Sequence, residues 1–198
     1  MTQVLGIMCS PRFGGNSDIL LDSALKGAEE GGAQIEKISL CDLHIAPCKE
    51  CLACDISGEC VQADDMRLLY PKLIEADRLF LASPIFFMGI SAQAKAMIDR
   101  CQCIWVRRYK MKQTIGRGRE HRKGFFLSVG GTKNPEKFSG AVKCVKAFFA
   151  TLDVTYEKEL LIADVDEKGA IERHPSALAD ARRMGKEILR YRIIGKLS

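Results

Sequence analysis

Four cysteines lie close together in the sequence, separated by two, two and five residues. They are Cys48, Cys51, Cys54 and Cys60. Two-residue spacings let successive thiolates point at one small metal centre. Structural zinc sites usually place two such pairs roughly a dozen or more residues apart, whereas a crowded run is typical of an iron–sulfur cluster. We therefore expect these cysteines to share one [4Fe–4S] cluster; a zinc site, redox-active disulfides and the remnant of a lost site are the alternatives.

The composition is that of an ordinary globular protein. Of the 198 residues, 47% are hydrophobic and 28% are charged, which allows one substantial core. No apolar run approaches the roughly 18–20 residues that span a bilayer, and no charged leader opens the chain, so we expect neither a membrane segment nor a signal peptide. Nine cysteines in such a chain indicate a reducing, cytoplasmic setting. Those outside the run are expected to be mostly core residues: Cys9, Cys41, Cys101, Cys103 and Cys144.

Short apolar runs and amphipathic stretches alternate five times along the chain. Strands are expected at 4–8, 34–40, 79–82, 124–129 and within 156–163. Helices are expected after an N-cap at Asn16 or Ser17, after Asp64 and Asp65, and at about 91–103, 137–152 and 175–193. This alternation predicts one α/β domain over residues 1–198, a flavodoxin-like, doubly wound sheet of five parallel strands in the order 2-1-3-4-5 with helices on both faces.

Three of these strands end in loops of small and polar residues, at 10–17, 84–89 and 128–131. Ligands of such sheets bind at the carboxyl ends of the strands, where the predicted order makes these loops neighbours. The first loop combines hydroxyls, glycines and Arg12 ahead of a helix N-terminus, a combination that favours a phosphate. It lacks the dinucleotide and P-loop glycine patterns, and Gly15 stands where a low-molecular-weight tyrosine phosphatase needs arginine. We expect phosphate binding here; an ordinary strand–helix connection is the alternative.

In this order the motifs resemble the NAD(P)H-dependent FMN reductase superfamily, and specifically its iron–sulfur flavoprotein branch. The resemblance rests on the stretches 9–17, 47–66, 83–87, 95–100 and 130–131. It implies that the first loop holds the FMN phosphate, the second lies along the isoalloxazine ring, and the third closes the other side. The implied FMN residues are Ser10, Pro11, Arg12, Gly15, Asn16, Ser17, Pro84, Ile85, Phe86, Phe87, Met88, Gly89, Ser128, Gly130 and Gly131.

The resemblance also implies an activity. The protein would be a flavin-dependent oxidoreductase or electron carrier, whose cluster in the loop 47–62 exchanges electrons between a donor (ferredoxin or NAD(P)H) and an acceptor. A homodimer or homotetramer, with the cluster close to a flavin, is implied as well. Because the chemistry would belong to the cofactors, we predict no catalytic side chain. A cluster-free NAD(P)H-dependent FMN or quinone reductase and a flavin or thiol redox sensor acting through a protein partner are the alternatives.

The net charge of +5 is concentrated in a basic insertion at about 107–123, which carries eight Lys or Arg and one acid. It could dock an acidic donor such as ferredoxin, meet the phosphates of NADPH, or be a solvated loop. Nucleic-acid binding is disfavoured because the insertion has one aromatic residue, Tyr109, and no recognised binding module. Asp99 and Arg100, on the helix after the second loop, are expected to form a structural ion pair.

Overall fold

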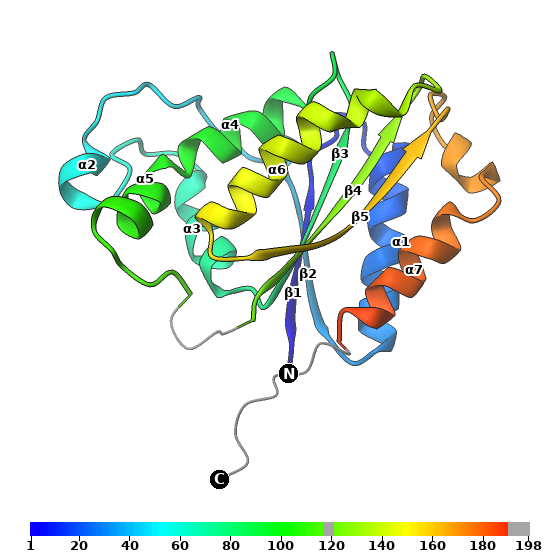
Figure 1. The fold of residues 1–198 in the computed structure, drawn as a ribbon, viewed down its shortest axis with the longest axis horizontal. Helices are drawn as coiled ribbons and strands as arrows, with labels where there is room; N and C mark the ends of the chain where they lie inside the picture. Colours follow the sequence, from blue (N-terminus) through cyan, green and yellow to red (C-terminus); the bar gives the residue numbers. More distant parts are fainter. Residues whose placement is uncertain (117–120, 190–198) are drawn as a thin grey trace, which may run out of the picture.

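The computed structural model describes residues 1–116 and 121–189 of the chain (Figure 1). Its centre is a sheet of five parallel strands in the order β2-β1-β3-β4-β5, which confirms the predicted flavodoxin-like topology. The strands are β1 (Gln3–Met8), β2 (Gln34–Ser39), β3 (Arg78–Pro84), β4 (Lys123–Gly130) and β5 (Thr155–Ala163). The strand order reverses between β1 and β3, so that the crevice at their carboxyl ends is the expected ligand site.

Helices cover both faces of this sheet (Figure 1). One face is covered by α1 (Asn16–Glu30) and α7 (Ala177–Glu187). The other is covered by α3 (Met66–Glu75), α4 (Ala92–Arg100), α5 (Gln102–Trp105) and α6 (Ser139–Thr151). The helix α2 (Cys54–Ser57) is a single turn inside the cysteine loop. Short 3-10 turns at Leu40–Asp42, Pro135–Phe138 and Ala170–Arg173 and a π-helical turn at Val106–Lys110 complete the described structure.

The central strands are apolar on both faces because each face meets a layer of helices. In β3, Leu79 and Leu81 pack with the layer of α3, α4, α5 and α6, whereas Phe80 and Ala82 pack with α1 and α7. A slip of one residue would exchange these two sets of side chains, so the double burial fixes the register of the sheet. The same register brings the carboxyl ends of β1, β3 and β4 to one edge.

The helix predicted at about 91–103 begins where expected but ends earlier, at Arg100. At its start, the Ser91 hydroxyl accepts a hydrogen bond from the Ala94 N–H at 3.2 Å. At its end, the carbonyl oxygen of Arg100 accepts hydrogen bonds from the Tyr70 hydroxyl at 2.9 Å and the Cys103 thiol at 3.5 Å. Side chains that insert into the hydrogen-bond ladder interrupt a helix. The chain therefore continues as the separate helix α5.

Two other helix ends differ from the prediction. The N-cap of α1 is Gly15 rather than Asn16 or Ser17, and no side chain among the described residues caps it. The last helix was expected at 175–193 and runs from Ala177 to Glu187; residues 190–193 lie outside the described residues.

The helix α7 packs on α1 at two glycines. A Cβ atom on Gly27 would lie 2.0 Å from the backbone oxygen of Arg182, and one on Gly185 would lie 1.9 Å from the backbone oxygen of Ala24. An ion pair between Glu30 and Arg182 flanks this contact. Because α1 begins at the first loop, its packing against α7 also holds that loop in place.

Replacing Gly185 with alanine should force the two helices apart. We expect the free energy of unfolding to fall by about 1–3 kcal/mol, the usual cost of adding volume to a close-packed contact. The measurement is urea denaturation followed by circular dichroism. The matched control is Arg183→Ala, because Arg183 lies on the same helix with an exposed side chain; it should change stability by no more than about 0.5 kcal/mol. Equal losses in both variants would contradict the close contact.

Candidate functional site

Three loops meet at the carboxyl edge of the sheet and line one small cavity. Ten residues of the predicted FMN set line it: Ser10, Arg12, Gly15, Asn16, Ser17, Pro84, Ile85, Phe86, Gly130 and Gly131. Five others, Pro11, Phe87, Met88, Gly89 and Ser128, do not. The cavity measures about 70 Å³. Drug-sized ligands fill pockets of about 300 Å³ or more, so this cavity suits a phosphate-sized group, and the rest of a nucleotide would lie across its rim.

The first loop presents hydrogen-bond donors to this cavity. The backbone N–H groups of Asn16 and Ser17 open α1 and have no acceptor within the helix. The Ser17 hydroxyl is buried and has no hydrogen-bond partner among the described residues. At Gly15, a Cβ atom would lie 2.8 Å from the backbone oxygen of Arg12, so only glycine lets the loop fold this tightly. A buried hydroxyl without a partner is costly, and an anion bound at this helix N-terminus would satisfy it.

The Asn16 side chain has a structural task that the sequence did not indicate. Its amide nitrogen donates to the carbonyl oxygen of Glu167 at 2.8 Å, and its amide oxygen accepts from the N–H of Ile171 at 3.2 Å. Asn16 therefore ties the segment after β5 to the first loop. Its backbone N–H, rather than its side chain, remains available to a ligand.

That segment supplies residues that the sequence analysis missed. The cavity is also lined by Val129, at the end of β4, and by three residues of this segment, Val165, Asp166 and Lys168. The signal for the last three was present in the topology, because the segment follows a fifth parallel strand whose carboxyl end lies at the same edge of the sheet. Lys168 adds a second cation to the one that Arg12 provides.

The second loop is a tight turn with exposed apolar side chains. Phe86 and Gly89 pair with each other across the turn, with N···O distances of 3.0 Å. Between them, Phe87 and Met88 have φ angles of 47° and 64°, which is the left-handed backbone of a two-residue hairpin turn. The Phe87 side chain is fully exposed and the Met88 side chain is about half exposed. The tip of this loop thus projects beyond the sheet, which is visible at the end of β3 in Figure 1.

The third loop contributes glycines to the cavity and a buried hydroxyl behind it. The Ser128 hydroxyl is buried and donates to the carbonyl oxygen of Ser83 at 2.7 Å, so this residue joins β4 to β3 and does not face the cavity. Behind Gly130, the buried Lys137 ammonium donates to the Gly130 carbonyl oxygen at 3.2 Å. Burial lowers the pKa of Lys137.

The four cysteines of the run line a second and larger cavity, of about 600 Å³. Residues of α4, α5 and α6 form its other walls, among them Arg100, Trp105 and Phe148. The part of the chain that the structure describes contains no group of three Cys, His, Asp or Glu side chains placed to hold a metal ion. The thiols therefore share a cavity without converging on a single point within it. The backbone of this loop is strained at Glu50 and Leu52, whose φ angles are 51° and 58°.

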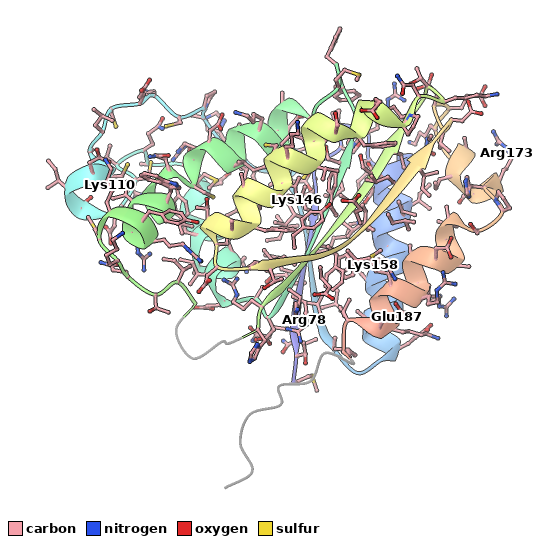
Figure 2. All side chains as sticks on the ribbon, in the orientation of Figure 1. Arg78, Lys110, Lys146, Lys158, Arg173 and Glu187 are labelled. Carbon is pink, nitrogen blue, oxygen red and sulfur yellow. The ribbon has the colours of Figure 1, made fainter. Side chains whose placement is uncertain are left out.

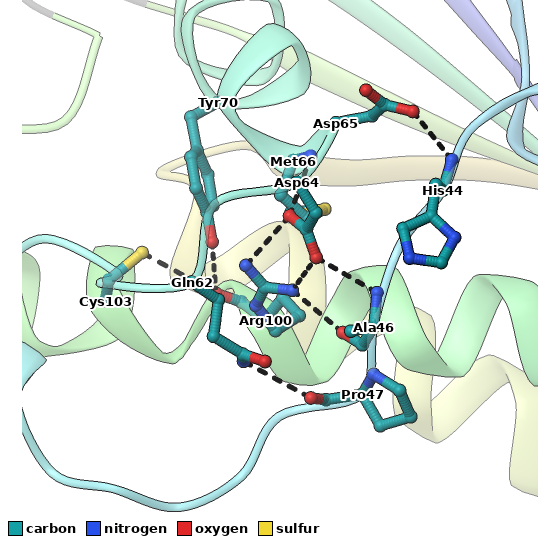
Figure 3. Close-up of polar contacts among 10 residues, drawn as sticks. All are labelled: His44, Ala46, Pro47, Gln62, Asp64, Asp65, Met66, Tyr70, Arg100 and Cys103. Carbon is teal, nitrogen blue, oxygen red and sulfur yellow. Dashed lines mark hydrogen bonds and ion pairs between the residues drawn. The ribbon is translucent and has the colours of Figure 1, made fainter.

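Both ends of the cysteine loop meet at Arg100 (Figure 3). The Arg100 guanidinium pairs with the Asp64 carboxylate through two nitrogens and donates to the carbonyl oxygen of Ala46 at 2.8 Å. The Asp64 carboxylate also accepts from the backbone N–H groups of Ala46 at 3.0 Å and Met66 at 3.2 Å. The ion pair predicted between Asp99 and Arg100 is wrong in its partners, because Asp99 pairs with Lys95 on the helix surface.

Two cysteines of the run differ in acidity. Burial raises the pKa of the Cys60 thiol, but the Gln62 backbone N–H and the Arg100 guanidinium outweigh burial, so that its pKa lies below the ordinary value. At Cys54, burial and the neighbouring Asp55 carboxylate raise the pKa. Cys60 therefore has a greater thiolate fraction than Cys54 near neutral pH.

The cysteines outside the run follow the prediction in part. Cys9, Cys101 and Cys103 are buried, as expected of core residues. Burial raises the pKa of all three. Cys41, in contrast, is exposed, and Cys144 is half-buried and lines the large cavity.

The basic insertion does not form one uniform surface. Lys110, labelled in Figure 2, lies beside the cysteine loop, with its Nζ 2.6 Å from the Asp55 carboxylate. Arg122 is buried and donates to three backbone carbonyl oxygens, so its role is structural. Residues 117–120 lie outside the described residues.

Within the described ranges, no helix is both long and apolar enough to cross a bilayer.

Comparison with known proteins gives a family match. The family model named NADPH-dependent FMN reductase matches residues 2–137. A protein named iron–sulfur flavoprotein from Archaeoglobus fulgidus is 34% identical over 154 residues, which are 78% of this chain and 66% of that protein. One of the same name from Methanosarcina thermophila is 33% identical over 132 residues, which are 67% of this chain and 65% of that protein. The chain thus spans slightly less than two thirds of the length of these relatives.

Solved structures agree on the fold. An NAD(P)H:quinone oxidoreductase from Methanothermobacter marburgensis superimposes with a TM-score of 0.64 at 19% identity, covering 94% of this chain and 98% of that chain. At this level of identity the likeness shows the fold alone.

The difference between the two thiols predicts an order of alkylation in the metal-free chain. Because the thiolate is the nucleophile, Cys60 should react with iodoacetamide at a lower pH than Cys54 does, with its rate levelling off earlier as the pH rises. Quenching the reaction at several pH values and measuring each peptide by mass spectrometry tests this order. The buried Cys101 serves as the slow reference. The interpretation is wrong if Cys54 reaches its plateau at the lower pH.

Proposed function

Because the chain belongs to the NADPH-dependent FMN reductase family, in its iron–sulfur flavoprotein branch, we propose that it is a flavin-dependent oxidoreductase that holds FMN and a [4Fe–4S] cluster. One observation carries this proposal: the four cysteines of the run line one cavity. Their chemistry suits iron, since four thiolates are the usual ligands of such a cluster. Metal binding would draw the thiols together and so order a loop that is strained without it.

The fit to FMN rests on the first loop. The buried Ser17 hydroxyl lacks a partner among the described residues, and the N-terminus of α1 and Arg12 face the same cavity. These groups match the phosphate of FMN. Pro84, Ile85 and Phe86 from one side, with Gly130 and Gly131 from the other, would border the flavin ring. The exposed Phe87 and Met88 would then gain cover from a ligand or a neighbouring subunit.

When bound, the flavin supplies two-electron exchange and the cluster supplies one-electron steps, so that the pair connects carriers of both kinds. The chain's own residues bind and orient these groups. We assign no acid–base side chain. The proposed electron donor is NAD(P)H or an acidic protein such as ferredoxin, which the exposed basic residues around Lys110 would attract. A homodimer or homotetramer in a reducing cytoplasm completes the proposal.

A cluster-free NAD(P)H-dependent FMN or quinone reductase is the second candidate. It is favoured by one observation: no three potential metal ligands converge in the described ranges. The two candidates share the FMN site and differ only in the task of the cysteine loop. Metal content separates them.

Protein purified without oxygen should contain about four iron, four sulfide and one FMN per chain if the proposal is correct. In a Cys51→Ser variant the iron should fall to near background, because a ligand is lost, while the FMN stays. Elemental analysis and the visible spectrum measure both. Cys41→Ser is the control, since Cys41 is exposed and lies outside the run. FMN without iron in the unmodified chain would favour the cluster-free reductase, and zinc in place of iron would favour a zinc site.

Removing the unpartnered hydroxyl should weaken FMN binding. We expect Ser17→Ala to raise the Kd for FMN about 10- to 100-fold, the loss that follows from removing one hydrogen bond to a charged group. Quenching of flavin fluorescence gives the Kd. The control is Ser23→Ala on the same helix, because that hydroxyl donates to the carbonyl oxygen of Leu178 instead. An unchanged Kd in the Ser17 variant would remove this hydroxyl from the phosphate site.

A further inference from the structure

The ends of the cysteine loop are joined by one side chain. Arg100 reaches from the end of α4 to the carbonyl oxygen of Ala46, which precedes the loop, and to the carboxylate of Asp64, which follows it (Figure 3). Asp64 closes the ring by accepting the Ala46 N–H at 3.0 Å. The chain segments at Ala46 and Asp64, which together form the neck of the cysteine loop, are therefore both fixed to the same guanidinium.

Arg100 is in turn held from its own backbone. Its carbonyl oxygen accepts from the Tyr70 hydroxyl of α3 and from the Cys103 thiol of α5. These contacts end α4 at this residue and fix the starting point of its side chain. The neck of the loop is thus anchored to the helical layer rather than to solvent-exposed chain.

The ion pair between Arg100 and Asp64 is buried, and a buried ion pair carries an energetic cost. Arg100 is 1% exposed, and the Asp64 side chain is 5% exposed. Removing two charges from water is costly, and a hydrophobic pair of equal volume often stabilises a fold as well or better. The pair is therefore weak evidence of general stability and leaves room for a specific task of the guanidinium.

One donor of that guanidinium is unused. The Nε atom of Arg100 is buried and has no hydrogen-bond partner among the described residues. Arg100 also lines the cavity that the four cysteines line. A buried N–H on a residue that lines the cavity of the four thiols would be satisfied by a thiolate or sulfide sulfur.

We propose that Arg100 is a positioning residue for the metal centre of the cysteine loop: its two terminal nitrogens hold the neck, and its Nε–H donates to a sulfur atom of the bound centre. This inference rests on the proposed function, since it needs a cluster in the loop. Hydrogen bonds to sulfur are among the features that set the reduction potential of an iron–sulfur cluster, and they raise it. Arg100 would therefore affect both the retention of the cluster and its potential.

Substituting lysine for Arg100 tests the planar geometry of the guanidinium separately from its positive charge. Lysine keeps one positive charge, but its single ammonium group cannot bond the carboxylate, a carbonyl oxygen and a sulfur in the planar geometry of a guanidinium. The matched control is Arg122→Lys. Arg122 is equally buried and donates to backbone carbonyl oxygens, but those belong to Leu73, Ala76 and Leu152, away from the cysteine cavity.

The experiment compares the two lysine variants with the unmodified chain after purification without oxygen. We expect R100K to lose iron to a chelator at least ten times faster and its cluster potential, measured by spectroelectrochemical titration, to become more negative. R122K should match the unmodified chain in both. An Asp64→Asn variant should share the faster iron loss of R100K. It replaces R100K in the comparison if R100K does not fold.

Thermal unfolding of the metal-free chains distinguishes positioning from general damage. Faster iron loss in R100K than in R122K at equal melting temperature supports the inference. Equal iron retention and equal cluster potential in all variants would overturn the inference. Iron loss that simply parallels a fall in melting temperature would overturn it too. Either result leaves the proposed function intact. If the unmodified chain itself binds no iron, the proposed cluster fails, and this inference fails with it.

Discussion

Burial of the sheet on both faces is the constraint on which the site depends. Parallel strands need helical crossovers, and those crossovers cover both sides of the sheet. Alternate side chains of β3 then pack into opposite layers, with Phe80 on one side and Leu81 on the other. This fixes the register, and with it the loops that follow β1, β3 and β4 come to one edge. The chain needs no separate device to bring the three loops together, because the core already does so.

Polar contacts then shape what the core has placed. The tight first loop depends on Gly15, where any side chain would meet the backbone of Arg12. Asn16 ties the segment after β5 against that loop, which adds Asp166 and Lys168 to the cavity. A phosphate-sized cavity thus comes from a helix N-terminus, the loops after β3 and β4 and the segment after β5. The exposed ring of Phe87, by contrast, has no cover within the described structure.

The sequence was sufficient for the features that follow from local pattern. The strands and helices were predicted because apolar period is a local signal, and the strand order and the meeting of the loops followed from the usual order of five alternating strands. Contacts between side chains far apart in the chain could not be predicted. The pairing of Arg100 with Asp64 spans 36 residues, and nothing in the spacing distinguishes it from a pairing with the adjacent Asp99. The early end of α4 was missed for the same reason, since it depends on the Tyr70 hydroxyl of another helix.

In the cysteine loop, the contacts that fix the position of the loop differ from the thiols that could bind a metal. Its thiols line one cavity, yet its backbone is strained at Glu50 and Leu52, and residues 47–52 are exposed. A loop of this kind gains little from burial, so its geometry depends on what fixes its ends and on what binds inside it. The ends are fixed by a buried ion pair that is costly in itself. For the metal centre proposed above, such fixed ends would keep the four thiols at one cavity.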